Sequence, residues 1–142
     1  EIASCLVGSE MCIRDSSDCS MTVARDFLEY LIEFCIEEGI PTKDNLIERS
    51  PDISRYIYCC LANKTCCITG EKAKVQLHHV DAVGMGRNRK DIIHLGMRVM
   101  PLRWDLHAEA HRIGQKSFDE KYKVFGIKLD EYLCKIWKVK YK

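Results

Sequence analysis

The sequence lacks the features that would assign it to several common classes of protein. Over 142 residues, no apolar run approaches the roughly 18 residues of a membrane-spanning helix. None of the nine cysteines forms a Cys-x-x-Cys pair, which disfavours a redox or zinc-storage protein built on cysteine. No internal repeat or low-complexity tract interrupts the chain. With 46% hydrophobic and 30% charged residues, the composition predicts a soluble globular protein of one domain, with at most a small helical extension.

The cysteines do not have the spacing of a disulfide-stabilised secreted domain. Cys59 and Cys60 are adjacent, as are Cys66 and Cys67, and several others fall within amphipathic helical patterns. No secretory signal peptide is recognisable in the sequence. We therefore expect free, mostly buried thiols and a cytoplasmic protein.

The net charge of +1 conceals a separation of charge along the chain. Residues 1–64 carry 6 basic and 12 acidic side chains, a net charge of −6, whereas residues 65–142 carry 16 and 9, a net charge of +7. A basic half of this kind favours a polyanionic partner such as a nucleic acid, although a solvated lysine-rich surface would give the same count.

The first 17 residues have the sequence of a cloning or sequencing artefact. The string CLVGSEMCIRDS, from Cys5 to Ser16, back-translates to a DNA sequence like a transposase-type sequencing-library adapter. We expect residues 1–17 to be an assembly scar or, alternatively, an ordinary disordered N-terminus. Either origin removes Cys5 and Cys12 from any functional site.

Two amphipathic helices are predicted within residues 18–64. The first begins near Met21 and is stopped by Gly39 and Pro41, and the second, DISRYIYCCLANK, begins at the pair Ser50 and Pro51. The apolar face of the first helix is expected at Ala24, Phe27, Leu28, Leu31, Phe34 and Cys35, with Arg25, Asp26, Glu29 and Glu33 facing solvent. The second should bury Ile53, Tyr56, Ile57, Cys60 and Leu61. Both helices would support the region that follows.

Short strands are expected next. Residues 66–68 and 73–80 would form a β-hairpin around the turn Thr-Gly-Glu-Lys, and residues 98–102 would form a further strand. Strand alternation places His78 and His79 on opposite faces, so both reach one site only if the strand ends or bends there. Two more helices close the chain, one with a capping box at Ser117 and Glu120 and one opened by Asp130.

All five histidines lie between His78 and His111, about a quarter of the chain. His107 and His111 stand four residues apart in WDLHAEAHRIG, a predicted short helix that Asp105 would cap and Gly114 would end. Residues i and i+4 share a helix face, so the two imidazoles could close on one metal ion.

The paired His-His, a linker of about thirty residues and the helical His-x-x-x-His together resemble the HNH nuclease motif, or ββα-metal finger. The stretches HHVDAVGMGRNR, HAEAHRIG and FDEKYKVFGIKLDEYL extend this similarity, over residues 22–142, to a phage and prophage group of HNHc nucleases. The resemblance implies an α+β fold, with the finger and C-terminal helices in residues 65–142. It implies metal ligands at His78, His107 and His111, and a general base at His79.

Two features of that group's pattern are missing from this sequence. Cys66 is present, but Thr69 and Arg103 stand where further cysteines would bind a structural zinc, so none is expected. Arg98 occupies the position of the motif asparagine. In related proteins that asparagine braces the loop, so another contact must brace the loop in this chain. No role follows for Asp81 or His94.

The resemblance implies a DNA endonuclease that uses one divalent metal ion to hydrolyse phosphodiester bonds. Imidazole ligands suit Zn²⁺, Ni²⁺ or Mn²⁺ better than Mg²⁺. DNA would be contacted by Arg87, Arg89, Lys90 and Arg98, although the first three also fit a polar surface loop. We expect DNA and no membrane as partner, with a homodimer as one option, and a phage or prophage protein acting in recombination or DNA processing within a bacterial host.

A non-catalytic DNA-binding or recombination accessory protein, with the finger as a metal-braced scaffold, is the alternative. The lost cysteine and asparagine positions favour this alternative. The intact His78-His79 pair disfavours it, because a scaffold needs no general base.

Overall fold

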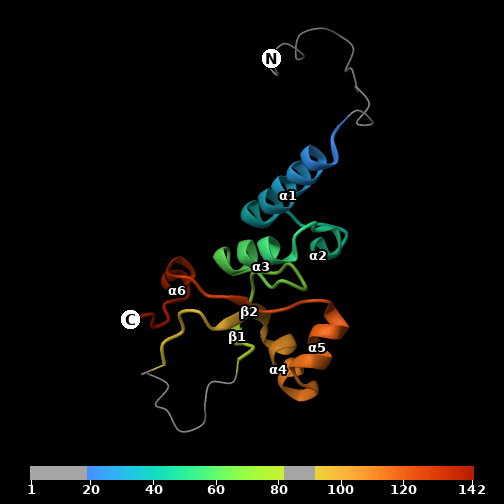
Figure 1. Ribbon diagram of the computed structural model, residues 1–142. Helices are drawn as coiled ribbons and strands as arrows, with labels where there is room; N and C mark the ends of the chain where they lie inside the picture. The colour runs from blue at the N-terminus through green and yellow to red at the C-terminus, as the bar shows by residue number, and fades with distance from the viewer. Residues whose placement is uncertain (1–18, 82–91) are drawn as a thin grey trace, which may run out of the picture.

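The computed structural model describes residues 19–81 and 92–142, which form six helices and a three-stranded sheet (Figure 1). The helices are α1 (Met21–Glu38), α2 (Leu46–Arg49), α3 (Ile53–Ala62), α4 (Trp104–Ile113), α5 (Gln115–Tyr122) and α6 (Glu131–Trp137). The strands are β1 (Val75–His79), β2 (Arg98–Arg103) and β3 (Ile127–Lys128). The expected α+β fold is confirmed. Within the described ranges, no helix has the length and apolarity needed to cross a membrane.

Helix α1 has the expected bounds but not the expected buried face. Ser20 caps its start by accepting a hydrogen bond from the backbone of Val23, and Gly39 ends it with a φ of 65°. Most of the predicted apolar stripe faces solvent instead, with Phe27 60% and Phe34 42% exposed, whereas Cys35 is half-buried. The buried residues are Ile32, Ile36 and Glu29.

An ion pair explains why Glu29 is buried and not exposed as predicted. The helix packs on α3 along one edge, and Arg55 of α3 donates a hydrogen bond to Glu29 at 2.6 Å and another to Glu33 at 3.0 Å. A carboxylate that is paired in this way can be buried where two helices pack against each other. Hydrophobic periodicity does not predict such a buried charge. In α3 itself, Tyr56, Ile57, Cys60 and Leu61 are buried as expected, but the N-cap is Asp52 and not Ser50.

The predicted hairpin of residues 66–68 with 73–80 is wrong. Residues 67–69 form a turn, and β1 pairs with β2 in antiparallel register, Val75 opposite Arg103 and His79 opposite Val99. The 66–71 segment closes on itself because the Cys66 amide donates to the Glu71 carbonyl at 2.9 Å. The next amide, that of Cys67, donates to Pro101 of β2 at 3.0 Å. The strand predicted at 98–102 is confirmed, and the two-residue β3 extends the sheet beside it.

Two of the predicted helix starts are also wrong. Helix α4 begins at Trp104 without a side-chain cap, and Asp105 lies in its first turn. Helix α5 begins at Gln115, directly after Gly114, so Ser117 lies inside the helix and forms no capping box. Asp130 does cap α6, since its side chain accepts a hydrogen bond from the Leu133 amide at 2.8 Å.

The N-terminal helices and the sheet share one hydrophobic core. Its fully buried side chains come from α3, β2, α5 and α6, and include Ile57, Leu61, Met100, Leu102, Phe118 and Leu133. Trp137 of α6 also donates a hydrogen bond to the Leu61 carbonyl at 3.0 Å. This core fixes β2, and through it β1 and α4, which carry the histidines.

Candidate metal centre

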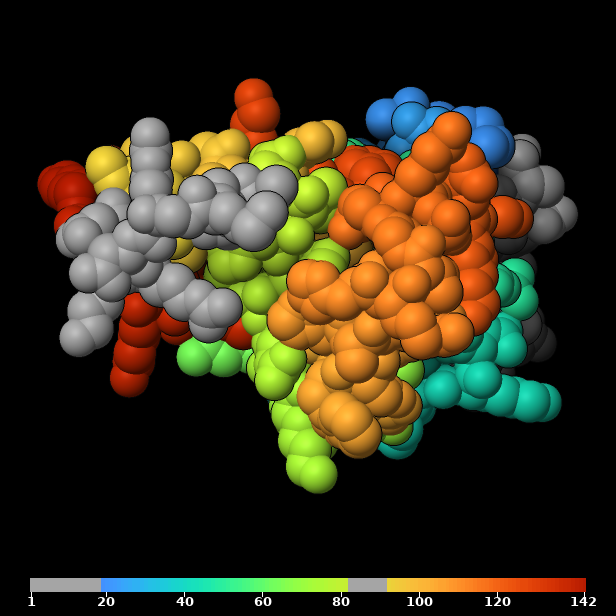
Figure 2. All heavy atoms as spheres, turned by 90° about the horizontal axis from the view of Figure 1, so that it is seen from below, coloured from blue at the N-terminus to red at the C-terminus, as the bar shows by residue number. Residues whose placement is uncertain are grey.

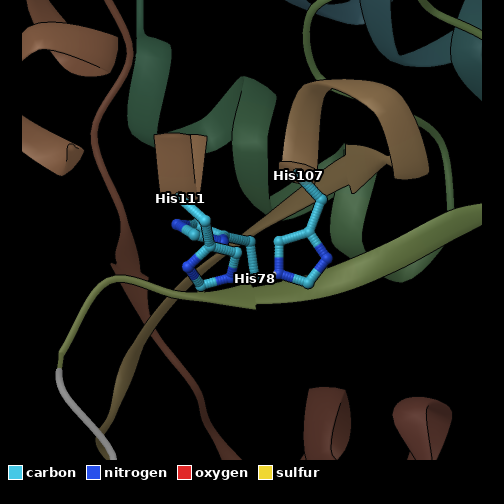
Figure 3. Close-up of side chains that lie close together, drawn as sticks. All are labelled: His78, His107 and His111. Carbon is cyan, nitrogen blue, oxygen red and sulfur yellow. Dashed lines mark hydrogen bonds between the residues drawn. The ribbon is translucent and has the colours of Figure 1, made fainter. Parts of the chain in front are cut away.

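Three histidines that are far apart in sequence meet between β1 and α4. His78 projects from the strand toward His107 and His111 of the helix (Figure 3). The ring centroids of His78 and His107 are 4.8 Å apart, and those of His78 and His111 are 5.1 Å apart. One ligand nitrogen from each residue lies within 4.8 Å of the other two. In the part of the chain that the structure describes, no other group of three metal-ligating side chains comes together in this way.

Neighbouring glutamines show which nitrogen of His78 and of His107 is left for a metal. Gln115 Oε1 lies 2.7 Å from His78 Nε2, and Gln76 Oε1 lies 2.6 Å from His107 Nδ1. Because an amide oxygen only accepts, both of these ring nitrogens carry the proton. His78 Nδ1 and His107 Nε2 then have free lone pairs.

The free nitrogen of His78 is the strongest indication of a bound cation. His78 is 2% exposed, and its Nδ1 is a buried polar atom without a hydrogen-bond partner among the described residues. Leaving such an atom unsatisfied costs roughly 1–3 kcal/mol. The Nε2 atoms of His107 and His111 lie 3.1 Å apart beside it. The ring of His111 is exposed, so its proton can lie on a water-facing Nδ1. The three nitrogens therefore fit one divalent transition-metal ion.

The protonation state also suits metal binding. Burial lowers the pKa of His78, and burial together with the neighbouring His78 and His111 lowers the pKa of His107 to about 4. Both imidazoles are therefore neutral at pH 7, the form in which histidine binds a metal. Gln115 is oriented in turn by Asp119, whose carboxylate accepts from the Gln115 amide at 2.6 Å.

The sequence interpretation missed both glutamines. Gln76 lies two residues before His78 on the same strand face, which was a usable signal, because outer partners of metal ligands often occupy such positions. Gln115 had no comparable signal, since a helix break at Gly114 separates it from the histidine helix.

His79 does not join the three-histidine cluster. Its Nε2 lies 2.9 Å from Nδ1 of His94, and the two ring centroids are 5.0 Å apart. Burial lowers the pKa of His79, and so do the nearby His94 and His78. His79 lies within electrostatic reach of His107, whose pKa it also lowers. A neutral imidazole with one engaged nitrogen thus stands beside the candidate metal centre.

Arg98, expected to bind DNA, forms an ion pair with Asp81. Its Nε and Nη2 donate to Asp81 Oδ1 at 3.0 and 2.7 Å, and its backbone amide donates to Oδ2 at 2.9 Å. The end of β1 is therefore tied to the start of β2, which is a bracing role at the motif asparagine position. The Arg98 side chain remains 54% exposed. The other predicted DNA contacts, Arg87, Arg89 and Lys90, lie outside the described residues.

Arg103, which stands where the pattern of the group has a cysteine, forms an ionic cluster. Its guanidinium donates to Asp105 at 2.6 and 2.7 Å and contacts Glu71, while its backbone amide donates to Cys66 Sγ at 3.3 Å. The hydrogen bond from Arg103 lowers the pKa of Asp105 to about 2. These contacts join the 66–71 turn to the start of α4 by hydrogen bonds and ion pairs.

Two antiparallel strands followed directly by a helix, with one candidate metal ligand on the first strand and two on the helix, define a ββα-metal finger of the HNH type. The chain belongs to the HNHc nuclease family, because the family model described as "Putative HNHc nuclease" matches residues 7–140. The matched region begins inside the segment that the sequence predicts to be a scar. Neither the curated proteins nor the solved structures give a match.

Proposed function

We propose that the protein is a metal-dependent DNA endonuclease, with His78, His107 and His111 as metal ligands and His79 as general base. The unpartnered, buried Nδ1 of His78, aimed at two further imidazoles, carries this proposal. A cation there would act as a Lewis acid, stabilising negative charge on a scissile phosphate oxygen and on the leaving 3′ oxygen.

The base step uses the neutral ring of His79. It takes a proton from a water molecule that attacks the phosphorus in line; a P–O bond to the water oxygen forms, and the bond to the 3′ oxygen breaks. Its lowered pKa keeps His79 unprotonated at pH 7 and ready to accept that proton. The leaving 3′ oxygen takes a proton from solvent water, and His79 later returns its proton to solvent, so that the products carry a 5′ phosphate and a 3′ hydroxyl group.

DNA would approach the finger from the side on which His111 is exposed. Seen from below, α4 and α5 lie beside the segment leading into β1 (Figure 2), and His111 is exposed to solvent. The net charge of +7 on residues 65–142 favours backbone binding, with Arg87, Arg89, Lys90 and Arg98 as candidate phosphate contacts. Cutting directed by the DNA backbone fits this set better than sequence-specific cutting. Recombination or processing of phage DNA in a bacterial host is the setting we propose.

A non-catalytic accessory protein is the second candidate. Its supporting observation is that Arg98 and Arg103 brace the finger by ion pairs, so that the fold serves a scaffold as well as a nuclease. The experiment that separates the two is incubation of purified protein with supercoiled plasmid and, in turn, Zn²⁺, Ni²⁺, Mn²⁺ or Mg²⁺, with a chelator as control. A nuclease nicks the plasmid with at least one metal and not with the chelator. DNA binding without nicking under any metal would support the accessory protein.

A further inference from the structure

His94 is the one histidine of the chain to which the motif assigns no role, and it contacts the proposed general base. Its Nδ1 lies 2.9 Å from Nε2 of His79, with the two ring planes inclined at 48°. We propose that His94 is the positioning residue of His79, accepting a hydrogen bond from its Nε2–H and thereby leaving Nδ1 of His79 as the atom that removes the proton from water. This inference rests on the proposed nuclease function.

The direction of the hydrogen bond decides whether His79 can act as a base. If Nε2 of His79 donates, the ring's second nitrogen, Nδ1, has a free lone pair. No hydrogen bond to that Nδ1 occurs among the described residues, and it is not an enclosed polar atom.

The backbone around His94 is fixed from two sides, as a positioning residue requires. The His94 amide donates to the Lys140 carbonyl at 2.8 Å, and the His94 carbonyl accepts from the Met97 amide at 3.1 Å. Two further bonds tie this turn to the start of α6: the Gly96 amide donates to Leu129 at 2.9 Å, and the Leu129 amide donates to Met97 at 3.0 Å. The C-terminal segment therefore fixes the position of His94, and His94 in turn contacts His79.

The surroundings of His94 are compatible with the accepting role. The side chain is half-buried, and burial lowers its pKa, so that the ring is neutral and one of its nitrogens has a free lone pair. Arg98 does not compete with His94 for a hydrogen bond to His79, because its guanidinium donates to Asp81. Among the described residues, His94 is the side chain with a hydrogen bond to His79.

Three single substitutions test this proposal. His94→Asn keeps an acceptor oxygen near the position of Nδ1, His94→Leu removes the acceptor, and Leu95→Ala is a control on the same turn with an exposed side chain. We expect His94→Leu to lower kcat roughly 10- to 100-fold, the usual effect of losing an outer partner of a catalytic group. KM, bound metal and the melting temperature should be unchanged. His94→Asn should recover part of the loss, and Leu95→Ala should cut like the wild type.

A double variant adds a readout that a purely structural role would not change. In the absence of His79 there is no base to position, so His94→Leu should cost nothing further when added to His79→Ala. The proposal is overturned if His94→Leu cuts as well as the wild type, if His94→Asn is no better than His94→Leu, or if the two losses multiply.

Nitrogen-15 NMR of the zinc-loaded wild type tests the hydrogen bond without reference to activity. The proposal predicts that the proton of neutral His79 resides on Nε2, and a proton on Nδ1 overturns it. If the wild type never cuts DNA, the proposed nuclease function fails, and the position of this proton alone decides the hydrogen-bond assignment.

Discussion

Oε1 of Gln76 lies 2.6 Å from Nδ1 of His107, so the proton of that imidazole faces away from the histidine cluster. The strand that carries one candidate ligand, His78, therefore also sets the tautomer of a second candidate ligand, His107, on the facing helix. Gln115 fixes the tautomer of His78 in the same way from the other side of the cluster.

Loss of the Gln76 acceptor should weaken metal binding. We expect Gln76→Leu to raise the Kd for Zn²⁺ roughly 10- to 100-fold, because the ring of His107 is no longer held with Nε2 toward the cluster. Gln76→Glu keeps an acceptor oxygen and should bind at least as tightly as the wild type. Calorimetric titration of the metal-free proteins measures both. Equal affinity in Gln76→Leu and the wild type would show that this contact does not orient the ligand.

Metal analysis of the purified protein should give one transition-metal ion per chain. His78, His107 and His111 provide the site, whereas Thr69 and Arg103 leave the 66–71 turn without a second set of ligands. A variant with all three histidines replaced by alanine should hold no metal. Two zinc ions in the wild type, one of them retained in that variant, would contradict the prediction.

The ion pairs of Arg103 should make part of the stability dependent on pH. The folded-state pKa of Asp105 is about 2, below the roughly 3.9 of an unfolded aspartate. The stabilisation is therefore present above pH 4 and is lost as the pH falls through about 2. We expect Arg103→Met to lower the melting temperature at pH 7, and the difference from wild type to shrink toward pH 2. Lys116→Met, which removes an exposed charge, is the control. A difference independent of pH would rule out the Asp105 pair as its cause.

Deletion of residues 1–17 should leave folding and activity unchanged. Helix α1 starts with its own cap at Ser20, which the deletion keeps. The family match nevertheless begins at residue 7, inside the deleted segment. Comparing the truncated with the full-length protein therefore tests whether this segment belongs to the domain. Thermal unfolding and plasmid cleavage of the two proteins provide the test. A truncated protein that melts several degrees lower, or that cuts more slowly, would show that the segment belongs to the domain.

The sequence predicted that His107 and His111 lie on one face of a short helix, because that spacing is local. It did not predict that His79 would lie outside the cluster, although β1 ends at that residue. The strand pairing was mispredicted because it is decided by contacts between distant segments. Residues 66–68 have strand-like composition, but the Cys67 amide bonds to Pro101 and β1 pairs with β2 across the 80–97 segment.

The buried side of α1 was mispredicted for a related reason. Periodicity finds the apolar face of a helix, but here an ion pair from Arg55 holds Glu29 against α3, and Phe27 and Phe34 remain exposed. The partner of His79 was likewise hidden, because the turn carrying His94 is placed by the C-terminal segment, forty-odd residues further on. Non-local polar contacts of this kind leave no periodic signal in a sequence.

The most direct test of the account compares His79→Ala with His107→Ala in a plasmid-cleavage assay, with bound metal measured on the same samples. We predict that His79→Ala lowers the cleavage rate roughly 10²- to 10⁴-fold, the usual contribution of a positioned proton acceptor. It should retain one metal ion per chain and its affinity for DNA, whereas His107→Ala should lose metal and cleavage together. Cleavage by His79→Ala at the wild-type rate, or a wild-type protein that nicks no DNA with any of the metals, would contradict the assignment of this site as a nuclease centre.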